Sequence, residues 1–274
     1  MKATEVKREI IQITKGNMVK KEDTVVTEFP VTVKMNGKEF VTMVCTPQYI
    51  EEMVIGYLAS EGIIKKYEDI KEIWVQQKEG FVHVKTDKVN PYYQDFQNKR
   101  YITSCCGMSR QGFVFVNDAW TAKKMDHVSI KLTPDDCFRL MNDLQSAAVT
   151  FLHTGGVHNA ALCGVDGLVL SRMDIGRHNA LDKIYGHCLK NGISMEGKAI
   201  VFSGRISSEI LLKVAKIGCE LILSKSAPTE LALELAEGLK ITTVGFIRHD
   251  SLNVYTCPER ILFDGSRGKN PAIK

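Results

Sequence analysis

The chain has 274 residues, of which 44% are hydrophobic and 25% charged, and its net charge is +4. This composition is typical of a folded globular protein and argues against a disordered or membrane protein. The first fifteen residues lack the apolar core of a signal peptide, so we expect a cytoplasmic protein. No basic run is dense enough to indicate nucleic-acid binding. The eight cysteines follow no disulfide-like spacing and should be reduced.

The N-terminal part has mainly strand-like patterns. Residues 6–44 are largely strand-like, and Asn36-Gly37 between two alternating runs predicts a β-hairpin. Apolar spacing over residues 50–58 predicts a helix that Gly62 closes. Alternation returns over residues 64–84, so we expect a β-rich first unit.

A second unit begins where Thr133-Pro134 marks a helix start, with Thr133 as the capping residue. Strands are expected at 160–163 and 168–175. Strand-then-helix patterns follow three times, through Gly176-Arg177-His178, Ser203-Gly204-Arg205 and Ser226-Ala227-Pro228-Thr229. This alternation predicts an α/β fold with a substantially parallel sheet, closed by strands near 242–247 and 253–255.

Cys105 and Cys106 lie between the two units, in a polar stretch where Gly107 and Arg110 follow them. The thiolate is the reactive form of cysteine, and a neighbouring cation and a flexible glycine favour an exposed, ionised thiol. Two alternatives remain open at this point. The pair could be small buried hydrophobic residues, or it could form a vicinal disulfide.

The three turns between strands and helices are candidate anion sites, because helix N-termini favour negative charge. Arg177 and Arg205 offer bidentate donors suited to phosphate. The alternative is structural. Ser203, Ser207 and Thr229 would then cap helices, and the arginines would be solvated or paired with Asp174 and Glu209.

Two histidines, His153 and His158, flank a glycine pair and are candidate metal ligands or bases. The chain has no Cys-x-x-Cys and no His-x-Glu, which disfavours a zinc ribbon and a zinc deaminase. We therefore expect no metal site. The sequence also lacks the Walker loop and the dinucleotide fingerprint, so any phosphate is bound in another way.

Several of these motifs together resemble the formate dehydrogenase accessory sulfurtransferase family, FdhD/NarQ. The most specific is Asp174-Ile175-Gly176-Arg177-His178-Asn179-Ala180-Leu181-Asp182-Lys183. The others are the cysteine loop, Thr154-Gly155-Gly156-Val157-His158-Asn159-Ala160-Ala161, Ser203-Gly204-Arg205, Ser226-Ala227-Pro228-Thr229, and Gly245-Phe246-Ile247-Arg248 with Asn253-Val254-Tyr255-Thr256.

The resemblance implies a mixed α/β (α+β) fold of two domains. A smaller β-rich domain would occupy residues 1–115, and a three-layer α/β/α domain similar to cytidine deaminase, without its zinc, would occupy residues 116–265. Residues 266–274 would form a flexible tail. The family also implies a homodimer.

The resemblance further implies a sulfurtransferase. Cys106 would accept a persulfide from a cysteine desulfurase and pass the sulfur to bis-molybdopterin guanine dinucleotide, which formate dehydrogenase then receives. The family pattern Cys-Gly-Val-Cys reads Cys106-Gly107-Met108-Ser109 here, so its second cysteine is missing. Cys105 is an additional thiol, and both a relay and a protective role remain open for it.

The cofactor, whose arms resemble GDP, would contact the family's C-terminal segment and the three turns. These residues are Phe246, Ile247, Arg248, His249, Asp250, Ser251, Gly176, Arg177, His178, Ser203, Gly204, Arg205, Ser226 and Thr229. Two alternatives to sulfur transfer are a chaperone that only binds the molybdenum cofactor and a deaminase-like hydrolase. The first would need no reactive thiol, and the second would need a metal.

Overall fold

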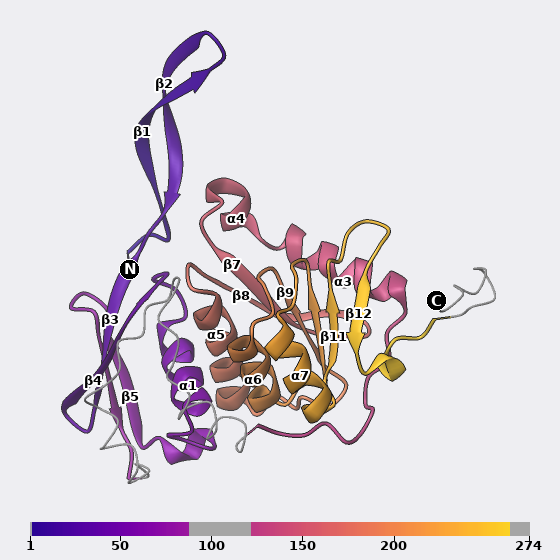
Figure 1. The fold of residues 1–274 in the computed structure, drawn as a ribbon. Helices are drawn as coiled ribbons and strands as arrows, with labels where there is room; N and C mark the ends of the chain where they lie inside the picture. Colours follow the sequence, from indigo (N-terminus) through magenta and orange to yellow (C-terminus); the bar gives the residue numbers. More distant parts are fainter. Residues whose placement is uncertain (1, 88–121, 264–274) are drawn as a thin grey trace. The chain divides into compact units, whose positions relative to one another are not determined.

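The structure is a computed structural model, described here for residues 2–87 and 122–263 (Figure 1). None of the helices in these two ranges is both long and apolar enough to cross a membrane. The strands are β1 (Glu5–Thr14), β2 (Asn17–Val26), β3 (Phe29–Met35), β4 (Lys38–Cys45), β5 (Glu72–Gln76), β6 (Phe81–Lys85), β7 (His158–Gly164), β8 (Gly167–Asp174), β9 (Ala199–Phe202), β10 (Leu221–Ser224), β11 (Thr242–Gly245) and β12 (Asn253–Thr256). The helices are α1 (Ile50–Ser60), α3 (Pro134–Ser146), α4 (Val149–Thr154), α5 (Arg177–Asn191), α6 (Ser208–Ile217) and α7 (Glu230–Leu239), with short 3-10 turns at Tyr67–Asp69 and Pro258–Arg260.

The chain divides into two compact units that are discontinuous in sequence. Unit 1 consists of Met1–Ala122, Leu144–Ala161 and Leu170–Ser194. Unit 2 consists of Lys123–Asp143, Leu162–Val169 and Met195–Lys274. The mixed α/β fold expected from the sequence is confirmed. The expected domain limits at residues 115 and 265 stay predictions, because both lie outside the described residues.

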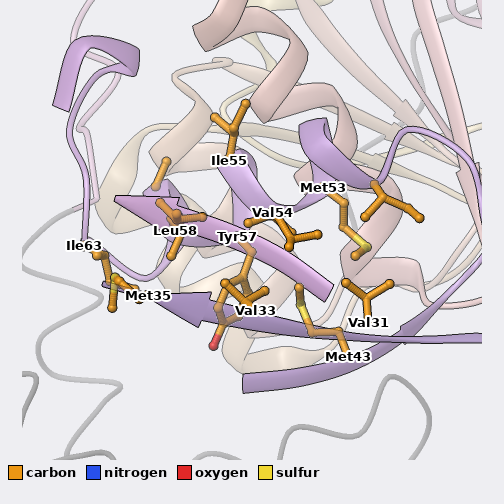
Figure 2. Close-up of a cluster of buried hydrophobic side chains, with 14 of the residues drawn as sticks. Val31, Val33, Met35, Met43, Met53, Val54, Ile55, Tyr57, Leu58 and Ile63 are labelled. Carbon is orange, nitrogen blue, oxygen red and sulfur yellow. The ribbon is translucent and has the colours of Figure 1, made fainter. Parts of the chain in front are cut away.

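Unit 1 contains a four-stranded sheet of order β4-β3-β6-β5. Its strands alternate buried apolar and more exposed residues, as in β3, where the odd-numbered positions from Phe29 to Met35 are buried. This is the pattern of a sheet with one face on a core. Helix α1 covers that face, and Met53, Val54 and Leu58 of the helix are fully buried in the cluster with Val31 and Val33 (Figure 2).

The turn between β3 and β4 is the one that Asn36-Gly37 predicts. Both residues have positive φ, 50° and 84°, as a two-residue hairpin turn requires. The side-chain nitrogen of Asn36 also donates to the carbonyl oxygen of Thr86 at 2.9 Å, and its side-chain oxygen accepts from the Thr86 backbone N–H. The turn is therefore attached to the segment after β6.

Helices α1 and α5 of unit 1 pack with their backbones in contact. A Cβ added at Gly56 would overlap the carbonyl oxygen of Asp182, and one added at Gly186 would overlap that of Glu52. Ser60 Oγ donates to Asp182 Oδ1 at 2.8 Å. Only glycine permits this approach, so the two positions fix how α5 lies on α1.

The N-terminal strands form a separate antiparallel ribbon, β1–β2, which we call the arm. Their register pairs every residue from Glu5↔Val26 to Thr14↔Asn17. In Figure 1 the arm extends away from the four-stranded sheet of its own unit, and nearly all its side chains are exposed. The sequence predicts strands here but not this turn, because the short Lys15-Gly16 step is a weak turn signal without buried alternation beside it.

A six-stranded sheet of order β12-β11-β10-β9-β7-β8 dominates the second half of the chain, and the two units divide β7 and β8 between them. In unit 2, β9, β10 and β11 are parallel and fully buried, and β12 is antiparallel to β11. Helices α6 and α7 connect these strands, as the alternation predicts.

Thr133 caps α3 as expected, because its Oγ1 accepts from the backbone N–H of Asp136 at 3.1 Å.

Candidate functional site

Three loops in unit 2 follow the carboxyl ends of β9, β10 and β11. They are residues 203–207, 225–229 and 246–252, and we call them the strand-end loops. The first leads into α6 and the second into α7. Parallel strands present these ends at one edge of the sheet, where ligands of open α/β sheets commonly bind.

Two serines join the first two strand-end loops. Ser224 Oγ donates to the carbonyl oxygen of Gly204 at 2.7 Å and accepts from the backbone N–H of Ser226 at 3.0 Å. Ser226 Oγ donates to the carbonyl oxygen of Ser203 at 3.1 Å. A parallel backbone bridge at Ile206 adds a further connection. The predicted residues Ser203, Gly204 and Ser226 therefore lie together.

The third loop is bonded to the second through its backbone. Phe246 N–H donates to the Ser226 carbonyl oxygen and Ile247 N–H to that of Ser224, both at 3.2 Å. A Cβ at Gly245 would lie 3.1 Å from the Ser226 carbonyl oxygen. Because Gly245 has no side chain, β11 can approach Ser226 closely and place Phe246 at the edge of the sheet where the three loops lie.

Arg248 spans the second and third loops. Its Nη1 donates to the carbonyl oxygens of Lys225 at 2.5 Å and of Ile247 at 3.1 Å. Its backbone N–H donates to the carbonyl oxygen of Ser251 at 2.9 Å, which shapes the loop that carries His249 and Asp250. The guanidinium carbon lies 6.0 Å from the centre of the exposed Phe246 ring.

The strand-end loops carry exposed cationic side chains, together with the exposed carboxylate of Asp250. Arg205, Lys225 and Arg248 are exposed there, and the N-termini of α6 and α7 point into the same loops. Ser207 and Thr229 are the N-cap residues, but neither makes a side-chain capping bond, so the capping alternative is wrong for these two. Cationic side chains and open helix N-termini are what phosphate groups bind.

The remaining predicted turn, Gly176-Arg177-His178, belongs to unit 1. Hydrogen bonds to the side chain of Asp174 hold it in place. Asp174 Oδ1 accepts from Gly176 N–H at 2.8 Å and Asn179 Nδ2 at 2.9 Å. Its Oδ2 accepts from the Thr46 N–H and Oγ1, both at 2.9 Å, and from Lys183 Nζ at 2.7 Å. We call these five residues the Asp174 network. They bring the loop before α1 to the first turn of α5.

The Asp174 network is closed to water. The side chains of Asp174 and Lys183 are 0% exposed, and Lys183 Nζ also donates to Thr46 Oγ1 at 2.7 Å and to the Met173 carbonyl oxygen at 3.0 Å. Burial of Cys45, together with the negative charge of Asp174, raises the pKa of its thiol to about 12, so this thiol stays protonated. The alternative in which Asp174 pairs with Arg177 is wrong, because Lys183 takes that place.

Arg177, the first residue of α5, is left without this partner. Its Nε is buried and donates no hydrogen bond to any of the described residues. Burial lowers the pKa of His158, and the positive charge of Arg177 lowers it further, although Asp174 opposes the shift. His158 is therefore favoured in its neutral form beside a cationic turn.

A further cluster in unit 1 escaped prediction. Arg172 Nε donates to Glu52 Oε2 at 2.6 Å, and its guanidinium carbon lies 3.8 Å from the centre of the Tyr49 ring. Burial raises the pKa of Glu52, but its bonds to Arg172 and His187 outweigh this, and the pKa is lowered. Arg172 and Tyr49 also line a cavity of about 200 Å³. More than a hundred residues separate Glu52 from Arg172, so no local motif indicates the cluster.

Of the predicted site residues, the structure brings together those of unit 2 and describes Gly176, Arg177 and His178 separately in unit 1. Cys105 and Cys106 lie outside the described residues, so their roles stay predictions. The unit 2 group is Ser203, Gly204, Arg205, Ser226, Thr229, Phe246, Ile247, Arg248, His249, Asp250 and Ser251.

A buried parallel sheet whose strands end in joined loops with exposed cations defines an α/β protein with a polar, cationic edge. The model of the FdhD/NarQ family matches residues 26–262, and the chain belongs to this family. It is 59% identical over 261 residues to the sulfur carrier protein FdhD of Shouchella clausii, covering 95% of this chain and 98% of the relative. It is 56% identical to the protein of that name from Bacillus subtilis, covering 93% and 96%.

The fold is similar to a crystal structure from Desulfotalea psychrophila. That protein is described as a proposed formate dehydrogenase accessory protein, and its sequence is 26% identical to this chain. The match covers 95% of this chain and 100% of the other, with a TM-score of 0.77. The family expected from the motifs is thus confirmed over most of the chain.

Proposed function

We propose that this chain is a sulfur carrier in the maturation of formate dehydrogenase. The observation that carries the proposal is the close similarity to relatives named sulfur carrier protein FdhD over nearly their whole length. The name of the Desulfotalea psychrophila protein supports formate dehydrogenase as the recipient. The sulfur donor would be a cysteine desulfurase of the same cytoplasm.

Sulfur would enter on Cys106. Its thiolate attacks the terminal sulfur of a persulfide on the desulfurase, a new S–S bond forms on Cys106, and the donor cysteine leaves as a thiolate. No oxidant is consumed, because one persulfide replaces another. Arg110, four residues after Cys106, would favour the thiolate that this attack requires.

The sulfur acceptor would be the molybdenum of bis-molybdopterin guanine dinucleotide, which the protein binds as a substrate. The strand-end loops support this proposal, because Arg205, Lys225 and Arg248 can neutralise phosphate oxygens there. Phe246 is 41% exposed beside Arg248, so its ring offers a surface on which a guanine base can stack. The turn at Gly176-Arg177-His178, in unit 1, stays a separate predicted phosphate contact.

Intact-mass analysis after incubation with a cysteine desulfurase and cysteine tests the proposal. The wild-type protein and Cys105→Ala should each gain a sulfur atom that a reductant removes, whereas Cys106→Ala should not. Formate dehydrogenase activation should be lost in Cys106→Ala and partly kept in Cys105→Ala. Full activation by Cys106→Ala would contradict sulfur carriage and favour a protein that only binds the cofactor.

A further inference from the structure

Ser224 is the last residue of β10, the strand between β9 and β11, and it is not among the residues that the sequence predicts for the site. It is fully buried, with 0% of its surface exposed. Its Oγ is bonded to the first strand-end loop at Gly204 and to the second at Ser226. Its carbonyl oxygen accepts from the Ile247 N–H of the third loop at 3.2 Å. One residue of the central strand therefore joins all three loops.

Each exposed cation of these loops lies next to a residue that Ser224 holds. Arg205 directly follows Gly204, and Arg248 directly follows Ile247. The third cation, in the second loop, is the residue directly after Ser224. Gly204 and Ile247 are buried, whereas the three cationic side chains are exposed. The backbone positions from which the cations extend are thus fixed relative to one another.

The spacing of the three loops suits linked phosphate groups. Adjacent strands lie about 4.8 Å apart, so cations from neighbouring strand ends can contact two phosphate groups of one ligand. A single phosphate group needs only one of the loops. Loops that are ordered before binding avoid the free-energy cost of ordering them during binding. A fixed spacing between loops therefore favours a diphosphate.

We infer that Ser224 is a positioning residue, which holds the cations of the three loops at the spacing that a diphosphate needs. Its burial keeps it from touching the ligand, so it acts only through the loops. The inference rests on the proposed function, in which these loops bind the GDP-like arms of the cofactor. In Ser224→Ala, the Gly204 carbonyl oxygen and the Ser226 N–H would lose their partner, and the loops would separate more easily. All the cationic charges would remain.

Calorimetric titration of the full chain with GDP and with GMP tests this role. We expect the wild-type protein to prefer GDP. Ser224→Ala should lower the affinity for GDP about tenfold and the affinity for GMP less than about threefold, because only the diphosphate depends on the spacing between loops. The preference for GDP should therefore shrink in this variant.

Thr256→Val is the matched control. The Thr256 hydroxyl is also buried, donates to the Ile241 carbonyl oxygen at 2.7 Å and accepts from the Thr243 N–H at 3.1 Å. It lies at the amino end of β11, opposite the end that carries the third loop. Both variants should lower the thermal unfolding midpoint to a similar extent, and only Ser224→Ala should change the nucleotide affinities. An equal loss of GDP affinity in Thr256→Val would reduce Ser224 to a purely structural residue.

Hydrogen exchange without nucleotide separates this inference from the proposed function. The backbone N–H groups of residues 203–207, 225–229 and 246–252 should exchange faster in Ser224→Ala than in the wild-type protein, and at the wild-type rate in Thr256→Val. Unchanged exchange in Ser224→Ala, or an unchanged preference for GDP over GMP, would overturn the positioning role and leave the proposed function intact. A wild-type protein that binds neither nucleotide would instead overturn the nucleotide site of the proposed function, and the preference for a diphosphate with it.

Discussion

The Asp174 network and the strand-end loops are both polar structures at the ends of strands. They differ in whether charged side chains remain exposed once the hydrogen bonds within each structure are formed. In the network, both carboxylate oxygens of Asp174 are saturated by donors and water is excluded. In the loops, serines and backbone groups form the connections, and Arg205, Lys225 and Arg248 remain exposed. The first arrangement supports a fold, and the second is available to a ligand.

The comparison makes its strongest prediction for Asp174→Ala. The change would leave the Lys183 ammonium buried without its carboxylate, and breaking such a pair costs about 3 to 5 kcal/mol. Urea unfolding should show this loss, or the variant should fail to accumulate as folded protein. Asp250→Ala, at an exposed carboxylate in the strand-end loops, is the matched control and should change stability by less than about 0.5 kcal/mol. A loss below about 1 kcal/mol for Asp174→Ala would remove the distinction between the two regions.

A smaller effect is expected from Gly56→Ala. This change would push α1 away from α5, the helix that carries Asn179 and Lys183. The new methyl group would overlap the Asp182 carbonyl oxygen, and overpacking of this kind typically costs about 1 to 3 kcal/mol. Gly238→Ala in α7 meets nothing within 4 Å and should stabilise that helix by up to about 1 kcal/mol. Thermal unfolding of the two variants should therefore shift in opposite directions. Equal shifts would show that the close helix contact is not tight in solution.

The smallest effect on stability, and the largest on binding, is expected for Arg248→Ala. Arg248 is exposed, and its hydrogen bond to the Lys225 carbonyl oxygen lies at the surface, so the free energy of unfolding should change by less than about 1 kcal/mol. Affinity for GDP should fall about tenfold, because a charge-assisted bond to phosphate contributes about 1.5 to 3 kcal/mol. Calorimetry at two salt concentrations measures both the loss and its electrostatic origin. Lys38→Ala, a change at the exposed first residue of β4, is the control. Unchanged affinity would place the nucleotide elsewhere.

Local patterns predicted much of this molecule. Asn36-Gly37 predicted a hairpin because its turn chemistry depends on two adjacent residues. Thr133 predicted the start of α3 for the same reason. The parallel sheet followed from alternating strands and helices, which places the strand-end loops at one edge even before any contact is known.

Contacts between distant residues could not be predicted in this way. Lys183 occurs in the most specific motif, but nothing in the motif shows that its partner is Asp174 or that Thr46 completes the network. No local sequence pattern indicates the cluster of Glu52, Arg172 and His187 either. Periodicity records which side of an element is apolar, and it does not record which element lies on that side.

The backbone contact between α1 and α5 has a consequence for synthesis. Gly56 and Asp182 are separated by 126 residues, so α1 waits on the order of ten seconds for its partner at typical translation rates of about 5 to 20 residues per second. Until then, the face of α1 that will receive α5 is exposed on a nascent chain. Unit 1 therefore completes its fold only after the ribosome has passed Ser194, and contacts of such long range close slowly. A chaperone that protects α1 during this interval would raise the yield of folded protein more than one acting on the finished chain.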